Sequence, residues 1–140
     1  MTAPAALNQR AKLALHQLGV LIVDDDAVQL MDMAQMLGDS GMVVFEARSA
    51  GEALGVLGTR TDVRVMITDV DMCRGDLNGY QLAKAVSARW PEISLLIVSG
   101  QSYPKAADLP EGARFMAKPY APSMLTANVF DFVSQQSGGI

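Results

Sequence analysis

The sequence contains little cysteine, histidine or tryptophan. Its 140 residues include one cysteine, Cys73, and one histidine, His16. One cysteine cannot form a disulfide within the chain, and it cannot complete a structural zinc site. His16 lies far in sequence from the other polar residues of interest, so we assign it no catalytic role. The chemistry of this protein must come from other side chains.

The sequence also lacks a long apolar run and an excess of positive charge. Its apolar stretches are too short to cross a bilayer, and no charged N-terminal region precedes an apolar core, so no secretory signal is expected. A net charge of −4 argues against nonspecific binding to nucleic acid or to an anionic membrane. We therefore expect a cytoplasmic protein that binds neither.

The composition favours one folded domain. Half of the residues are hydrophobic and only 19% are charged, which predicts a packed core and not a disordered chain. We expect residues 19–135 to form this domain. Residues 1–18 precede it as an arm or a short helix, and residues 136–140 follow it as a flexible tail.

Apolar strands and amphipathic helices alternate from residue 19 onward. Short apolar runs predict buried strands, and apolar residues three and four apart predict helices. The expected strands are 19–24, 42–47, 63–69, 93–98 and 113–117, and the expected helices are about 27–39, 50–58, 78–89 and 122–134. Between 102 and 112, Pro104 and Pro110 leave room for at most a turn or two of helix. This alternation predicts an α/β fold, with a parallel sheet covered by helices on both faces.

Polar side chains stand where four of the apolar strands end. Asp24 and Asp25 follow the first strand and Asp69 ends the third, while Ser99 and Lys118 follow the fourth and fifth. In an open parallel sheet, ligands bind outside the carboxyl ends of the strands. We therefore expect these side chains to converge in one pocket.

Such a pocket suits a metal ion and a phosphate group. Three carboxylates close together repel one another, so a hard divalent cation such as Mg²⁺ (or Mn²⁺) is the natural occupant. The hydroxyl and the ammonium can bind an anion beside the metal. Positioning and charge neutralisation are what phosphoryl transfer to a carboxylate requires. The residues thus predict phosphoryl transfer to one of these carboxylates.

Four segments in this order resemble the receiver domain of two-component response regulators: VLIVDDD at 20–26, VMITDVDM at 65–72, LLIVSG at 95–100 and FMAKPY at 115–120. The resemblance covers about residues 19–135 and implies a flavodoxin-like, doubly wound sheet of five parallel strands in the order 2-1-3-4-5. The chain is similar to single-domain receivers of the chemotaxis-regulator type. The segment 69–93 also resembles receivers found with alphaproteobacterial sensor kinases.

The resemblance implies roles in metal and phosphate binding. Asp69 would be the phosphoacceptor, and Ser99 and Lys118 would bind the phosphoryl group. The implied Mg²⁺ ligands are the carboxylates of Asp24, Asp25 and Asp69 and the backbone carbonyl of Asp71.

The resemblance also implies roles in switching. Phe115 would be the aromatic switch residue, whose ring turns inward when Ser99 moves toward the phosphate. Asp71 and Gln101 would tune the lifetime of the phosphoryl group. Pro119 follows Lys118 where the family has a cis peptide bond.

The implied partners are a histidine kinase or a histidine phosphotransfer protein as phosphoryl donor, and an unknown downstream protein. No effector domain follows, so we expect a stand-alone receiver that signals through protein contacts or acts as a phosphate relay or sink. The short segment between Ser99 and Lys118 implies a shortened fourth helix. This argues against the usual dimer face, so a monomer or a weak homodimer is expected.

Two other functions fit parts of the sequence. Asp69-Val70-Asp71 resembles the DxD motif of haloacid-dehalogenase-like phosphatases. In that family the DxD motif follows the first strand and the metal-binding acids come last, whereas here the acidic pair comes first. A receiver-like docking module that is never phosphorylated is the other alternative, and the complete set of site residues argues against it. We therefore expect a signalling domain and not an enzyme.

Overall fold

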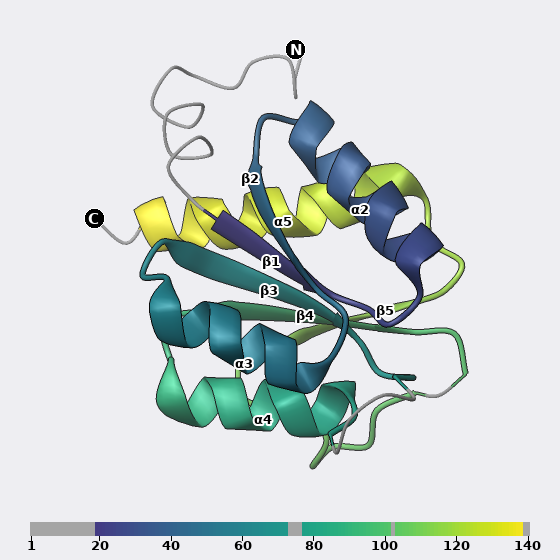
Figure 1. Ribbon diagram of the computed structural model, residues 1–140, viewed down its shortest axis with the longest axis vertical. Coiled ribbons are helices and arrows are strands. Elements are labelled where there is room, and N and C mark those ends of the chain that lie inside the picture. Colours follow the sequence, from purple (N-terminus) through teal and green to yellow (C-terminus); the bar gives the residue numbers. More distant parts are fainter. Residues whose placement is uncertain (1–18, 73–76, 102, 139–140) are drawn as a thin grey trace.

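The computed structural model describes residues 19–72, 77–101 and 103–138. The predicted arm or helix at 1–18 and the loop around Cys73 lie outside the described residues. The strands are β1 (Gly19–Val23), β2 (Val43–Ala47), β3 (Val63–Asp69), β4 (Ser94–Ser99) and β5 (Arg114–Ala117) (Figure 1). The helices are α2 (Ala27–Asp39), α3 (Ala50–Thr59), α4 (Gly79–Arg89) and α5 (Pro122–Gly138).

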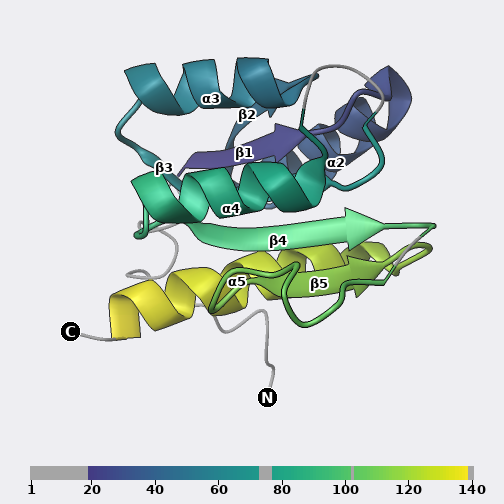
Figure 2. The same cartoon turned by 90° about the horizontal axis from the view of Figure 1, so that it is seen from below.

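The five strands form one parallel sheet in the order β2-β1-β3-β4-β5. The predicted flavodoxin-like order of a doubly wound sheet is confirmed. β1 and β4 point the same way in Figure 2, so their carboxyl ends lie at one edge of the molecule. The strand order reverses between β1 and β3, which is where ligands bind in sheets of this kind.

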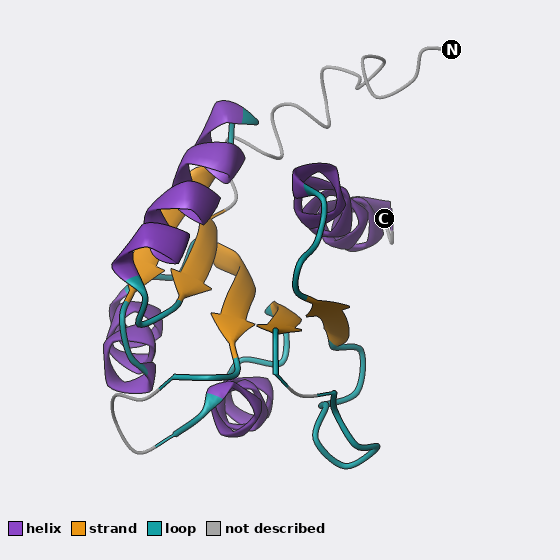
Figure 3. Ribbon diagram, turned by 90° about the vertical axis from the view of Figure 1, so that its right-hand side faces the viewer, coloured by secondary structure: helices purple, strands orange, loops and turns teal. Residues whose placement is uncertain are grey.

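Helices cover both faces of the sheet (Figure 3). Successive strand residues point to opposite faces, so Val20 and Ile22 pack in the layer of α2 and α5, while Leu21 and Val23 pack in the layer of α3 and α4. All four are at most 1% exposed. Each buried aliphatic side chain of this kind contributes about 1.5–3 kcal/mol of transfer free energy. Burial on both faces explains why the strands are almost continuously apolar.

The segment between β4 and β5 has no helix in its described residues, 100–101 and 103–113. The helix between β4 and β5, which the sequence predicted to be short, is therefore absent from these residues. The chain forms turns instead, with backbone hydrogen bonds from Asp108 to Lys105 and from Ala113 to Pro110. Two prolines in this stretch, Pro104 and Pro110, lack the N–H groups that a helix needs.

The last helix is longer than predicted. α5 ends at Gly138 and not near residue 134, so residues 136–138 are helical and the predicted tail from 136 onward is wrong in this part. No proline interrupts the sequence after Pro122, and glycine is a common residue at a helix end. On α5, Phe132 is buried at 3% exposure, whereas Phe130 is only partly buried.

Candidate metal and phosphate site

Three carboxylates meet at the carboxyl ends of β1 and β3. Asp24 and Asp25 directly follow β1, and Asp69 is the last residue of β3. Val23 pairs with Thr68, so the two strands end side by side. One oxygen atom from each of the three carboxylates lies within 4.8 Å of the other two. Oxygen atoms this close can share one divalent cation.

Asp24 is the most deeply buried acid of this cluster, with 1% of its surface exposed. Its Oδ1 accepts a hydrogen bond from the backbone N–H of Asp26 at 2.9 Å. Among the described residues, its buried Oδ2 has no hydrogen-bond partner. Burial, together with repulsion from Asp69, raises the pKa of Asp24 to about 6. A buried carboxylate oxygen without a donor is a cost that a bound cation would remove.

Lys118 directly follows β5 and forms an ion pair with Asp69. Its Nζ lies 2.9 Å from Asp69 Oδ1, and the Asp69 side chain is 6% exposed. Burial raises the pKa of Asp69, although the hydrogen bond and charge of Lys118 oppose this. Burial also acts to lower the pKa of Lys118, but the hydrogen bond and charge of Asp69 outweigh it, so this pKa is raised. The ammonium therefore stays charged at neutral pH.

Ser99 lies behind the surface of the pocket. It ends β4 and is 1% exposed. Its hydroxyl donates a hydrogen bond to Asp71 Oδ2 at 3.0 Å and accepts one from the backbone N–H of Gln101 at 3.2 Å. The pocket surface beside β4 is formed by Gly100 and Gln101. The Ser99 hydroxyl thus lies beside the carboxylate of Asp71, which accepts its hydrogen bond in this structure.

Phe115 lies in β5 beside Ile97 of β4. It is partly buried against the layer of α3 and α4. Its ring centroid lies 5.8 Å from that of Tyr103, which is 77% exposed. The proposed role of Phe115 as a switch residue remains a prediction.

Gly79 allows α4 to begin directly against the end of β3. A Cβ atom at this position would lie 2.3 Å from the backbone oxygen of Asp69 and 2.7 Å from the Cα of Val70. Asn78 caps the helix through a capping box with Gln81. Any larger residue at Gly79 would have to displace the backbone that carries Asp69.

Arg48 is one site residue that the sequence analysis did not identify. It follows β2, and its guanidinium donates a hydrogen bond to the backbone carbonyl of Asp25 (3.3 Å). Ala47 pairs with Val23 in the parallel register. Applying to β2 the rule used for the other strands, that polar residues after strand ends converge, would have indicated Arg48.

Gln29 is a second residue of this kind. It lies in the first turn of α2, and Lys118 Nζ donates a hydrogen bond to its Oε1 at 2.6 Å. The signal in the sequence is its position three residues after Asp26, because residues three apart lie on one face of a helix. Nothing in the sequence indicates that Lys118, 89 residues later, reaches this face.

The cluster opens into a pocket at the carboxyl ends of the strands. Its lining residues are Asp24, Asp25, Asp26, Gln29, Asp69, Asp71, Gly100, Gln101 and Lys118. The residues present fit a divalent cation, because they supply three carboxylates and a buried oxygen without a hydrogen-bond donor. The cation at Lys118 fits an anion beside it. The peptide bond between Lys118 and Pro119 is cis.

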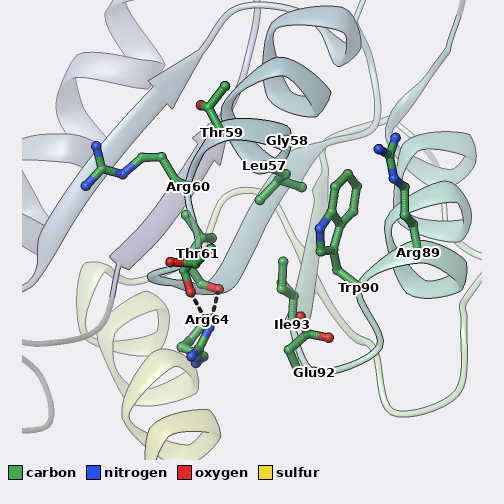
Figure 4. Close-up of a pocket in the computed structure, with 11 residues that line it drawn as sticks. Leu57, Gly58, Thr59, Arg60, Thr61, Arg64, Arg89, Trp90, Glu92 and Ile93 are labelled. Carbon is green, nitrogen blue, oxygen red and sulfur yellow. Dashed lines mark hydrogen bonds between the residues drawn. The ribbon is translucent and has the colours of Figure 1, made fainter.

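A second pocket lies at the opposite ends of the strands, where β3 and β4 begin (Figure 4). Trp90 and Ile93 line it together with three arginines. Arg60 is paired with Asp62 at 2.9 Å, and the guanidinium of Arg89 stacks on Trp90 at 4.6 Å. No carboxylate cluster of the described residues is found there. The acidic pocket, and not this one, carries chemistry suited to a cation and a phosphate.

The fold and the site together define a flavodoxin-like α/β protein with an acidic pocket, and a lysine in it, at the switch point of the sheet. Comparison with known proteins gives the family. The response regulator receiver domain matches residues 20–130, and the chain belongs to this family. Receiver domains are signalling modules that interact with histidine kinases or phosphotransfer proteins.

Relatives occur in plants and bacteria. The chain is 36% identical over 109 residues to a two-component response regulator of Oryza sativa, a match that covers 74% of this chain and 73% of the rice protein. It is 32% identical over 126 residues to the hydrogenase transcriptional regulatory protein of Cupriavidus necator, covering 86% of this chain and 25% of that longer protein.

Solved structures agree with the fold. A response regulator receiver protein from Pseudomonas putida superimposes with a TM-score of 0.74 at 28% identity, over 82% of this chain and 97% of that one. A chemotaxis-regulator-like receiver domain protein from Methanospirillum hungatei gives a TM-score of 0.77 at 25% identity, over 88% and 98%. Within the described residues, no helix is both long and apolar enough to cross a membrane.

Proposed function

We propose that this protein is a phosphorylatable receiver in which Asp69 accepts a phosphoryl group from a histidine kinase or a histidine phosphotransfer protein. The observation that carries the proposal is the contact of Asp69 with Lys118 (2.9 Å) inside a cluster of three carboxylates. The carboxylate is the nucleophile, and the ammonium compensates the charge that arrives with the phosphoryl group.

Asp24, Asp25 and Asp69 are the residues that would hold Mg²⁺, with the backbone carbonyl of Asp71. When bound, the ion neutralises charge on the carboxylates and on the transferred phosphoryl group. The unpaired Oδ2 of Asp24 supports this assignment. In this proposal Asp24 and Asp25 act as ligands and do not react.

The transfer exchanges one bond to phosphorus for another. An oxygen of the Asp69 carboxylate forms a P–O bond as the P–N bond of the phosphohistidine breaks, and the electron pair of that bond leaves with the imidazole nitrogen. Lys118 keeps its proton and pairs with the phosphoryl oxygens. Hydrolysis by water later returns Asp69 and releases inorganic phosphate.

Phosphorylation would change the contacts of Ser99. Its hydroxyl, which donates a hydrogen bond to Asp71 in this structure, would turn to the phosphoryl oxygens. The ring of Phe115 would then turn inward, toward the position that the Ser99 side chain leaves. The position of Phe115 supports this proposal, because its ring is only partly buried against the layer of α3 and α4, with the exposed ring of Tyr103 on it, so an inward turn would bury it further. The turns at 103–113 are the adjoining segment that a downstream partner would read.

Two exposed apolar side chains on α2 support a protein as phosphoryl donor. Val28 and Met31 are 62% and 61% exposed, and they lie three residues apart on one face of the helix that begins beside the pocket. Exposed apolar side chains beside a reactive site are typical of a docking surface. The signal would then pass to a downstream protein, or the phosphoryl group would pass to another carrier.

An alternative is a receiver-like docking module that is never phosphorylated. A phosphatase with an aspartate nucleophile is less favoured, because the acidic pair precedes Asp69 in the chain.

To test the proposal, we would incubate the protein with acetyl phosphate and Mg²⁺ and measure intact mass. We expect one phosphoryl adduct on the wild type and none on Asp69→Asn. The wild-type adduct should not form when a chelator removes the Mg²⁺. An adduct on Asp69→Asn, or none on a wild type exposed to small donors and to phosphorylated phosphotransfer proteins, would overturn it.

A further inference from the structure

The side chain of Gln29 links the start of α2 to the reactive lysine. Lys118 Nζ donates hydrogen bonds to Gln29 Oε1 at 2.6 Å and to Asp69 Oδ1 at 2.9 Å. The shorter of these two contacts is the one to the neutral amide. Gln29 lines the acidic pocket but is not among the residues that resemblance to receivers indicates.

The helix cap fixes the direction of the Gln29 amide. Asp26 is the N-cap of α2 and accepts hydrogen bonds from the backbone N–H groups of Val28 and Gln29. The side-chain Nε2 of Gln29 also donates to Asp26 Oδ2 at 3.4 Å. If the amide were reversed, its NH₂ group would face the ammonium and its oxygen would face the carboxylate. Both contacts would then be repulsive, so the oxygen is held toward Lys118.

A neutral acceptor suits the task of positioning this lysine. The long side chain of lysine loses up to about 2 kcal/mol of rotamer entropy when it is ordered. A carboxylate at position 29 would also order it, but would compete with Asp69 and with the phosphoryl group for its charge. The amide oxygen fixes the ammonium while leaving its positive charge available.

From these contacts we infer that Gln29 is a positioning residue that holds the Lys118 ammonium at the rim of the pocket for phosphoryl transfer. The inference rests on the proposed function, because it concerns how Lys118 meets the phosphoryl group on Asp69. The chain Asp26–Gln29–Lys118–Asp69 thereby couples the cap of α2 to the reacting carboxylate.

The first measurement needs no phosphorylation. The ¹⁵N–¹H signal of the Lys118 ammonium is observed by NMR at low temperature and assigned by its loss in Lys118→Arg. In Gln29→Met, which keeps the length of the side chain but removes its oxygen, we expect this signal to broaden or disappear through faster exchange with water. In Gln135→Met, the same change at an exposed position of α5, it should stay. An unchanged signal in Gln29→Met would overturn the inference.

The second measurement is the initial rate of phosphorylation by acetyl phosphate with Mg²⁺. Gln29→Met should lower it about tenfold, since hydrogen bonds to charged groups are among the stronger ones, and Gln29→Glu should lower it further. In a Lys118→Arg background the Gln29→Met change should have no further effect. An equal loss in both backgrounds would show that Gln29 acts independently of Lys118. A wild type that accepts no phosphoryl group would overturn the proposed function, and the NMR result would still decide whether Gln29 holds Lys118.

Discussion

The hydroxyl of Ser99 donates its hydrogen bond to the carboxylate of Asp71, at 3.0 Å, across 28 residues of sequence. Ser99 is the last residue of β4, and Asp71 lies two residues after the end of the neighbouring strand β3; the two strands pair up to Asp69 and Val98. Asp71 is partly exposed at the pocket surface, and Ser99 is buried behind it. A phosphoryl group on Asp69 would have to compete with Asp71 for this hydroxyl.

This competition predicts that Asp71→Ala lengthens the life of the phosphorylated protein. The substitution removes a carboxylate that repels the phosphoryl group and accepts the Ser99 hydrogen bond, and it leaves the backbone carbonyl in place. We expect hydrolysis to slow by about fivefold, the change in rate that corresponds to roughly 1 kcal/mol. The measurement is the decay of the phosphoryl adduct after the donor is removed. The exposed Asp39→Ala provides the control for an equal change in charge. Equal or faster hydrolysis in Asp71→Ala would contradict the competition.

The raised pKa of Asp24 predicts how stability depends on pH without metal. This pKa is about 6 in the folded protein and 3.8 in the unfolded chain. Between these values the folded state binds more protons, so the free energy of unfolding should fall as pH rises from about 4 to about 6, and this contribution should be constant above that. Asp24→Asn should remove this dependence and stabilise the metal-free protein at pH 7 by about 1–2 kcal/mol, with allowance for the open side of the pocket.

Denaturant unfolding at pH 5 and 7, with chelator and with Mg²⁺, measures this effect. Mg²⁺ should stabilise the wild type more at pH 7 than at pH 5, because the cation and the proton compete for Asp24, and it should have little effect on Asp24→Asn. The matched variant is the exposed Asp32→Asn, which should behave as the wild type. An Asp24→Asn protein that is less stable than the wild type at pH 7 in chelator would refute the prediction.

Much of the fold and the site could be predicted from the sequence because its signals are local. The apolar runs identify the strands, and polar residues after them identify Asp24, Asp69 and Lys118 as neighbours once the sheet is parallel. Arg48 could have been found by applying the same rule to β2. Gln29 could not, because its contact with Lys118 depends on side-chain length and direction. The extent of α5 was missed because glycines near a chain end suggest a tail and also end helices.

Close packing at the start of α4 predicts a large effect of a small substitution. In Gly79→Ala the added methyl group would lie 2.3 Å from the backbone oxygen of Asp69, so either the helix or the strand end must move. We expect a loss of about 2–4 kcal/mol in the free energy of unfolding and slower phosphorylation. Gly55→Ala, in the exposed middle of α3 with no atom within 4 Å, should instead stabilise the protein by about 0.5–1 kcal/mol. Denaturant unfolding of both variants decides between backbone crowding and a general effect of helix propensity. A Gly79→Ala protein as stable as Gly55→Ala would show that the contact yields easily.

The exposed pair Val28 and Met31 predicts a difference between protein and small-molecule phosphodonors. A glutamate at either position should leave the rate with acetyl phosphate within about twofold, because neither side chain lines the pocket. Transfer from a phosphorylated histidine phosphotransfer protein that labels the wild type should fall by about tenfold or more, since a charge in an apolar interface costs at least about 1.4 kcal/mol. Val43→Glu, an exposed position at the amino end of β2, is the control for an added charge away from the pocket. The loss should appear in the concentration of donor needed for half-maximal rate. Equal losses with both donors would mean that the substitutions damage the site itself, and no loss with either would exclude this face of α2 as the docking surface.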